Sequence, residues 1–162
     1  MNTSSLSKNK KITLLLFALF FCYGVEWSAS IFTQSSVSSW YRDLDKPFWT
    51  PPNIAFPIVW TILYTMIGIS FWLILCTPKA YTPRVFIAFF GQMLANFTWS
   101  LFFFYLQSPF LGFLNIVVLI AAISWNIYVF NIYSKWASKL LIPYWMWVVY
   151  AMTLNFGILI LN

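Results

Sequence analysis

Residues 54–76 read IAFPIVWTILYTMIGISFWLILC, a stretch without a single Asp, Glu, Lys or Arg. A helix that crosses the hydrocarbon core of a bilayer needs about 20 consecutive apolar residues, and this stretch meets that length. Barrel strands alternate polar and apolar residues and run for about ten, so the stretch does not fit a barrel. Because lipid offers the backbone no hydrogen-bond partners, the sequence predicts a membrane-spanning helix here.

Four more stretches of this kind lie along the chain, at about 12–32, 85–106, 110–133 and 140–161. Prolines and short polar segments separate them, such as Pro78 and Pro83 before the third span and Ser108-Pro109 before the fourth. The chain shows neither an internal repeat nor a second domain. We therefore expect residues 1–162 to form one all-α integral membrane domain, a bundle of five transmembrane helices in the cell membrane.

The composition narrows the chemistry. Charged residues make up 7% of the chain and aromatic residues 23%, whereas soluble domains carry about 25% charged residues. This balance excludes a soluble enzyme and a disordered chain. It also disfavours nucleic acid as a partner, because a phosphate groove needs a basic stripe. The chain has no His, so we expect no metal and no cofactor. Cys22 and Cys76 sit in or beside apolar runs, which favours buried thiols over a disulfide or a metal pair.

The basic residues predict the orientation of the chain. The N-terminal segment and the second and fourth loops share one side of a five-span protein, and they hold Lys8, Lys10, Lys11, Lys79, Arg84, Lys135 and Lys139. The other side holds Arg42 and Lys46, both in the first loop. Since basic residues favour the cytoplasmic side, the N-terminus is predicted inside and the C-terminus outside.

The first span also fits a second reading. The basic residues before Ile12, the apolar run that follows and Ser28-Ala29-Ser30 together match a cleaved signal peptide. Local pattern alone leaves a retained span and a cleaved segment both open.

The long first loop, residues 33–53, contains the segment WYRDLDKPFWTPP at 40–52. Prolines fix their own φ and favour an extended residue before them, so this segment is stiff as well as rich in rings. It fits an interfacial aromatic belt, because Trp and Tyr prefer the headgroup level. It fits equally a lid over a cavity between the helices.

Three helical faces carry rings and amides. They are Phe56, Trp60 and Tyr64 on the second span, Gln92, Asn96, Trp99, Ser100 and Phe103 on the third, and Tyr144, Trp147, Ala151 and Asn155 on the fifth. Amides are costly in lipid, so these faces should point inward. There they either bond neighbouring helices together or line a cavity for a flat apolar ligand. Glu26, the one acid within a predicted span, either reaches the interface or has a function.

These residues also carry a resemblance. The pattern Trp40-Tyr41-x-x-Leu44-x-Lys46-Pro47-x-Trp49-x-Pro51-Pro52, followed by Phe56-x-x-Val59-Trp60-x-x-Leu63-Tyr64, resembles the first-loop and second-helix motif of the translocator protein family. This is the tryptophan-rich sensory protein or peripheral-type benzodiazepine receptor family, TspO/MBR. Asn96-x-x-Trp99-Ser100 and Pro143-Tyr144-x-x-Trp147-x-x-x-Ala151-x-x-x-Asn155 agree with its third and fifth helices.

The resemblance implies a retained first span and a homodimer of five-helix bundles. It implies a receptor or transport protein that binds protoporphyrin-like tetrapyrroles and other hydrophobic small molecules, in tetrapyrrole or stress homeostasis. Matched position by position, the ligand-binding residues are Tyr41, Trp49, Trp60, Tyr64, Asn96, Trp99, Tyr144, Trp147 and Ala151. Arg42 and Lys46 are the cations on the predicted outer side, so we expect them to pair with ligand carboxylates at the pocket mouth.

Two alternatives accompany this prediction. Some bacterial relatives are described as degrading protoporphyrin in light, and Trp60 and Trp147 occupy the positions implicated there. The residues do not otherwise predict an enzyme, because the chain lacks a set of proton-transfer groups. The other alternative is a regulatory or interaction subunit of the membrane. Sterol binding is disfavoured, because the family's proposed sterol motif needs a Lys or Arg after a C-terminal Tyr, and none follows Tyr144 or Tyr150.

Overall fold

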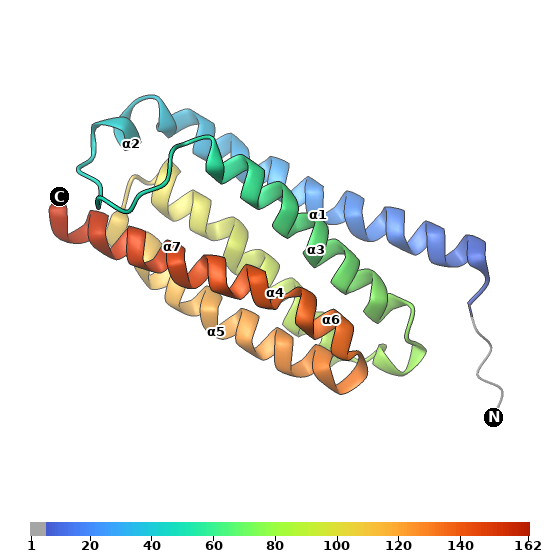
Figure 1. Cartoon of the computed structure of the whole chain (residues 1–162). Helices are drawn as coiled ribbons and strands as arrows, with labels where there is room; N and C mark the ends of the chain where they lie inside the picture. Colours follow the sequence, from blue (N-terminus) through green and yellow to red (C-terminus); the bar gives the residue numbers. More distant parts are fainter. Residues whose placement is uncertain (1–5) are drawn as a thin grey trace.

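The computed structural model describes residues 6–162, which form helices joined by short loops (Figure 1). The elements in chain order are α1 (Lys8–Val37), α2 (Trp40–Asp43), α3 (Ala55–Leu75), the 3-10 turn η1 (Pro78–Ala80), α4 (Pro83–Ser100), the π-helical η2 (Leu101–Tyr105), α5 (Pro109–Tyr133), α6 (Lys135–Leu140) and α7 (Ile142–Leu161). Five helical stretches are long and apolar enough to cross a membrane, and η2 extends α4 while α6 leads into α7. The five predicted spans are confirmed.

The first helix is longer than the predicted 12–32 and extends beyond it at both ends. At its start the Ser7 side chain accepts a hydrogen bond from the Lys10 backbone N–H at 3.4 Å and caps the helix. At its end the hydroxyls of Ser30 and Ser35 donate to backbone carbonyls one turn back, each at 2.7 Å. The helix ends at Val37, so residues 33–37 of the predicted first loop, 33–53, belong to α1.

Capping residues and prolines begin the later helices. The side chains of Thr82, Ser108 and Ser134 accept from backbone N–H groups in the first turns of α4, α5 and α6. Pro83 and Pro109 occupy the first turns of α4 and α5, where a missing N–H costs little. These local signals set short connections, so neighbouring spans pack antiparallel.

The helices pack around an aromatic core. Helix α1 lies against α3, α4 and η2, while α5 lies between α4 and α7. Phe71 of α3 and Phe89 of α4 stack with ring centroids 3.8 Å apart, and Phe89 also stacks on Phe130 of α5 at 6.3 Å. This core fills the half of the bundle that lies nearer the start of α1.

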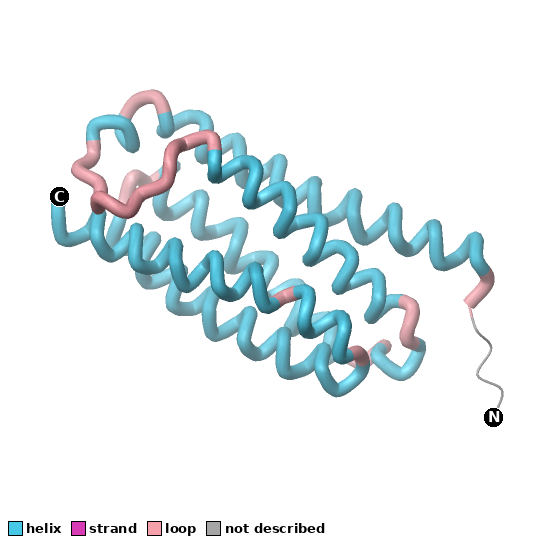
Figure 2. The backbone as a smooth tube through the Cα atoms, viewed as in Figure 1, coloured by secondary structure: helices cyan, strands magenta, loops and turns pink. Residues whose placement is uncertain are grey.

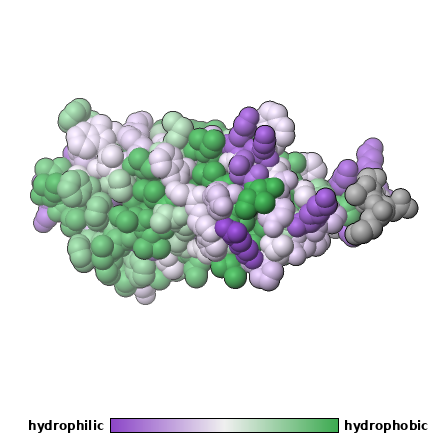
Figure 3. All heavy atoms as spheres, turned by 90° about the horizontal axis from the view of Figure 1, so that it is seen from below, coloured by the Kyte–Doolittle hydropathy of each residue, from purple (hydrophilic) through white to green (hydrophobic). Residues whose placement is uncertain are grey.

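The outer surface of the bundle is apolar. Phe20 and Trp27 on α1 and Ile87 on α4 are among many large hydrophobic side chains that remain exposed. Figure 3 shows hydrophobic side chains over much of one face, with hydrophilic ones gathered toward the end where α1 begins. A soluble protein rarely exposes such a continuous apolar area. The protein is a multi-pass integral membrane protein.

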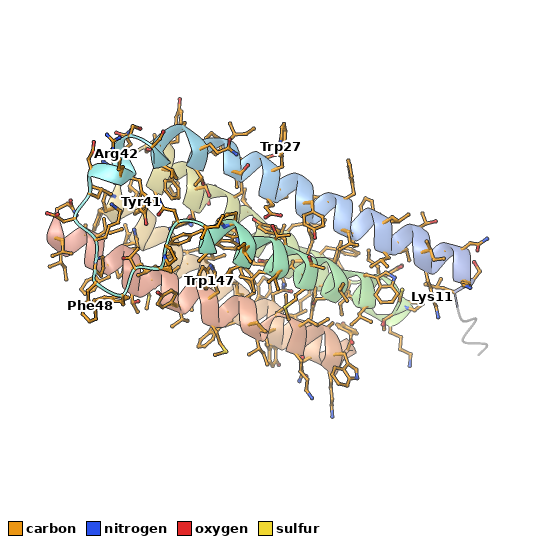
Figure 4. All side chains as sticks on the ribbon, turned by 45° about the horizontal axis from the view of Figure 1, so that its top comes forward. Lys11, Trp27, Tyr41, Arg42, Phe48 and Trp147 are labelled. Atoms are coloured by element: carbon orange, nitrogen blue, oxygen red, sulfur yellow. The ribbon has the colours of Figure 1, made fainter. Side chains whose placement is uncertain are left out.

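The basic residues lie at the two ends of the bundle. Those of the N-terminal segment, η1, the start of α4 and α6 are at one end, and Arg42 and Lys46 are at the other (Figures 1 and 4). The start of α1 and the end of α7 also lie at opposite ends, as an odd number of spans requires. Which end faces the cytoplasm stays a prediction.

Candidate functional site

A cavity of about 640 Å³ lies between α1, α3, α4 with η2, and α7, at the end of the bundle away from the start of α1. Helix α2 contributes Tyr41 to its wall, and the loop contributes Asn53. The volume is within the range of about 300–1,000 Å³ that small-molecule sites have. Most of the wall is apolar or aromatic.

Six of the predicted ligand-binding residues line this cavity. They come from four different elements and are Tyr41, Trp60, Tyr64, Asn96, Trp99 and Ala151. Their convergence follows from antiparallel packing, because each side chain lies on the face of its helix that points into the bundle. Trp99 stacks on Phe103 of η2 with ring centroids 5.5 Å apart and 14° between the planes, so the two rings lie nearly parallel.

Tyr144 lies behind the cavity wall instead of lining it. Its side chain is fully buried, and its hydroxyl accepts a hydrogen bond from Asn96 Nδ2 at 2.6 Å. Asn96 Oδ1 in turn accepts from the Tyr64 hydroxyl at 2.8 Å. The amide therefore joins α3, α4 and α7 through two tyrosines, and this network holds the floor of the cavity in place.

Two predicted tryptophans also lie outside the cavity. The ring centroid of Trp147 on α7 lies 6.1 Å from that of Phe56 on α3, so Trp147 contacts a wall residue without lining the cavity itself. Trp49 is 43% exposed, and its backbone carbonyl accepts a hydrogen bond from the Tyr150 hydroxyl at 2.7 Å. Trp49 therefore fastens the loop to α7 through its backbone.

The loop between α2 and α3 runs across the end of α7 (Figure 2). Buried Pro47 lies against Gly157, where a Cβ atom would come within 2.3 Å of the proline Cγ. Asn162 exchanges two hydrogen bonds with the Asp45 backbone, each at 3.0 Å. These contacts fasten the loop to the bundle beside the cavity.

The two predicted mouth cations have local partners. Lys46 Nζ donates to the carbonyls of Arg42 and Leu44 at 3.0 and 2.9 Å, and it lies 4.9 Å from the ring centroid of Tyr41. Arg42 pairs with Asp43 at 2.9 Å, and both of these side chains are largely exposed. Burial raises the pKa of the Tyr41 phenol above its usual value, so the hydroxyl stays protonated. Lys46 is thus adjacent to a wall residue, and neither cation lines the cavity.

Helix α1 supplies a wall that the ligand-binding prediction missed. Glu26, Ala29, Ser30, Thr33 and Val37 line the cavity, and their spacing of three or four residues was available in the sequence. The sequence pattern was weak because this face of α1 carries small or polar residues and no aromatic side chain. Phe56, Phe103 and Asn155, which the predicted helical faces contain, line the cavity as well.

Two polar groups on the wall lack partners. Both amide atoms of Asn155, which is 2% exposed, and the Trp99 indole N–H make no hydrogen bond within residues 6–162. Buried polar groups are normally paired, so these unpaired atoms are an exception in the cavity wall. The same described residues contain no group of three or more His, Cys, Asp or Glu that could hold a metal.

Comparison with known proteins agrees with this architecture. Residues 17–161 match the family model described as "TspO/MBR family". The chain belongs to the TspO/MBR family. It is 42% identical over 139 residues to "Tryptophan-rich protein TspO" of Archaeoglobus fulgidus, covering 85% of this chain and 90% of that protein. It is 41% identical over 156 residues to the protein of the same name from Chlorobaculum tepidum, covering 95% and 99%.

More distant TspO/MBR relatives carry other names. The human "Translocator protein" is 26% identical over 130 residues, which cover 78% of this chain and 77% of the human protein. A "Tryptophan-rich sensory protein" from Cereibacter sphaeroides is 28% identical over 123 residues, covering 76% and 77%. The names concern sensing and translocation, and the predicted family is confirmed.

Proposed function

We propose that this TspO/MBR protein is a receptor or transport-type membrane protein that binds tetrapyrroles of the protoporphyrin type, and other flat apolar molecules, in the cavity between its helices. As the family resemblance implies, it works as a homodimer. The observation that carries the proposal is the ring-lined cavity, bordered by four helices and by Tyr41.

The wall chemistry supports a flat apolar ligand. Trp60, Trp99 and Phe103 line the cavity, and the rings of Trp99 and Phe103 stack on each other. Aromatic contacts contribute about 0.5–1.5 kcal/mol each beyond the burial of apolar area. Two such contacts, one with Trp60 and one with the Trp99–Phe103 stack, therefore contribute on the order of 1–3 kcal/mol.

The mouth chemistry supports carboxylates at one edge of the ligand. Lys46 uses two of its three ammonium protons on backbone carbonyls and keeps one for a partner. Arg42 is exposed and pairs only with the adjacent Asp43 within the described residues. Both cations lie at the cavity end of the bundle, where a propionate of a seated tetrapyrrole would reach the surface.

Titration of the detergent-solubilised protein with protoporphyrin in the dark tests the proposal. Quenching of tryptophan fluorescence and the shift of the porphyrin absorption band report binding. Trp60→Ala removes a wall ring, and Trp27→Ala is the matched control because Trp27 points out of the bundle (Figure 4). We expect Trp60→Ala to weaken binding about tenfold, worth roughly 1.4 kcal/mol, with the control unchanged. Equal affinities in both variants would remove the cavity as the binding site.

A further inference from the structure

Glu26 is the one charged residue among the described residues that line the cavity. It lies on α1, and Thr61 Oγ1 donates to its Oε1 at 3.4 Å, a long contact. The salt bridge found in residues 6–162 joins Arg42 to Asp43, so no basic side chain pairs with Glu26. A carboxylate inside a span is costly unless it faces the protein interior or a water-filled cavity. Its place on the wall meets that requirement, and no residue of 6–162 provides a counterion for the charge.

The rings around the cavity favour a cation as the missing partner. Phe56, Trp60, Trp99 and Phe103 line the same space, and aromatic faces attract ammonium groups most strongly where water is excluded. No basic side chain of residues 6–162 lines the cavity, and Lys46, which lies near Tyr41 of its wall, donates to two backbone carbonyls. One carboxylate within walls of aromatic rings is the chemistry that recognises an organic ammonium ion.

A second observation also indicates a ligand. Asn155 of α7 lines the cavity, is 2% exposed and leaves both amide atoms without a partner in the described chain. The amide has two N–H donors and a carbonyl acceptor for a molecule that reaches it, in addition to the charge on Glu26. Two walls of the cavity therefore carry polar groups without partners among the described residues: the Glu26 carboxylate on α1 lacks a counterion, and the Asn155 amide on α7 lacks a hydrogen-bond partner.

We infer that this cavity also binds protonated or quaternary amines carried on a flat apolar body, with the ammonium group against Glu26 and the body among the aromatic rings. This selectivity is separate from the proposed tetrapyrrole function. That function uses Arg42 and Lys46 at the surface for anionic groups, whereas the amine site uses an acid within the bundle. A ligand with only a carboxylate gains nothing from Glu26.

A matched pair of probes isolates the charge. The ammonium probe is (2-naphthylmethyl)trimethylammonium, and the neutral probe is its carbon isostere, 2-neopentylnaphthalene. Equilibrium dialysis with the full chain in nanodiscs of phosphatidylcholine measures binding, and empty nanodiscs correct for partition into lipid. The proteins are the wild type, Glu26→Gln, Glu26→Asp and Asp45→Asn, in which an exposed acid outside the cavity loses its charge in the same way.

We expect Glu26→Gln to weaken the ammonium probe by about tenfold or more and the neutral probe by less than about twofold. Asp45→Asn should leave both affinities unchanged, and Glu26→Asp should retain part of the preference. The inference is overturned if Glu26→Gln binds the ammonium probe as tightly as the wild type. It is also overturned if the wild type, whose folding is not in question, binds the ammonium probe no more tightly than the neutral one.

Protoporphyrin titrations on the same samples separate the two proposals. Loss of the ammonium preference with intact protoporphyrin binding removes the amine site and leaves the tetrapyrrole function standing. An ammonium preference without protoporphyrin binding supports the amine site and rules out the tetrapyrrole function.

Discussion

Replacing Gly157 with alanine tests how firmly the loop beside the cavity is fastened. A Cβ atom at this position would lie 2.3 Å from Pro47 Cγ and 3.3 Å from Pro47 Cβ. Carbon atoms attract best at about 3.5–4.0 Å, so the loop and α7 must separate by roughly 1.2 Å or more. Because Pro47 is buried, the separation has to move the backbone of the loop.

Overpacking of this kind costs about 1–3 kcal/mol. The movement also strains the hydrogen bond from Tyr150 to the Trp49 carbonyl, and those between Asn162 and the Asp45 backbone. A bond of this kind contributes about 0.5–1.5 kcal/mol to stability. We therefore expect a variant that is less stable and has a loosened loop while its helices remain.

Thermal unfolding in detergent measures the stability. The rate of trypsin cleavage after exposed Arg42 measures how firmly the loop is fastened. Gly24→Ala is the matched control, because it makes the same change within a long helix and its Cβ meets nothing within 4 Å. Gly157→Ala should lower the melting temperature and speed cleavage, whereas Gly24→Ala should do neither. If the two variants melt and cleave alike, the loop is not held by this contact and the reasoning is refuted.

Three further variants test the cavity and its mouth. In Gly112→Ala a Cβ would lie 2.8 Å from Phe103 Cδ2, which should press that ring into the cavity and lower protoporphyrin affinity in a fluorescence titration; unchanged affinity contradicts this. Asn96→Leu leaves two buried tyrosine hydroxyls without their amide partner, so it should cost about 1–3 kcal/mol in thermal unfolding, and a melting temperature equal to that of the wild type argues against the network. Replacing Arg42 and Lys46 together by alanine should weaken protoporphyrin more at low salt than at high salt, because exposed charge pairs are screened. An affinity loss that salt does not change, or no loss at all, counts against their pairing with ligand carboxylates.

Much of the candidate site was visible in the sequence, because helical spacing identifies the side chains that share a face. Trp60 and Tyr64 on one span, and Asn96 and Trp99 on another, line the cavity as the pattern placed them. The pattern did not separate the front of a wall from its back. Tyr144 belongs to the same predicted face as Ala151, yet it lies behind the cavity, bonded to Asn96.

The first loop shows a different limit of sequence reasoning. Its prolines and rings predicted a stiff segment, and this agreed with either an interfacial belt or a lid. The structure gives the rings two separate roles, since Tyr41 lines the cavity while Phe48 is 95% exposed. The loop also meets α7, at the contact of Pro47 with Gly157. That contact joins residues more than a hundred positions apart, and no local pattern records it.

The sequence by itself determined that the protein lies in a lipid bilayer, how many spans it has and to which family it belongs. Apolar runs of this length are stable only in lipid, where backbone hydrogen bonding requires helices, so length and composition suffice for that conclusion. The tertiary structure decided which polar groups share one cavity and which form hydrogen bonds with neighbouring helices. Within residues 6–162 it places Glu26 on the cavity wall without a counterion and leaves the Asn155 amide without a hydrogen-bond partner, while the Asn96 amide bonds to two tyrosines. The reason is physical: a helix face of given spacing can meet a neighbour or a void, and only the packing of all five helices determines which.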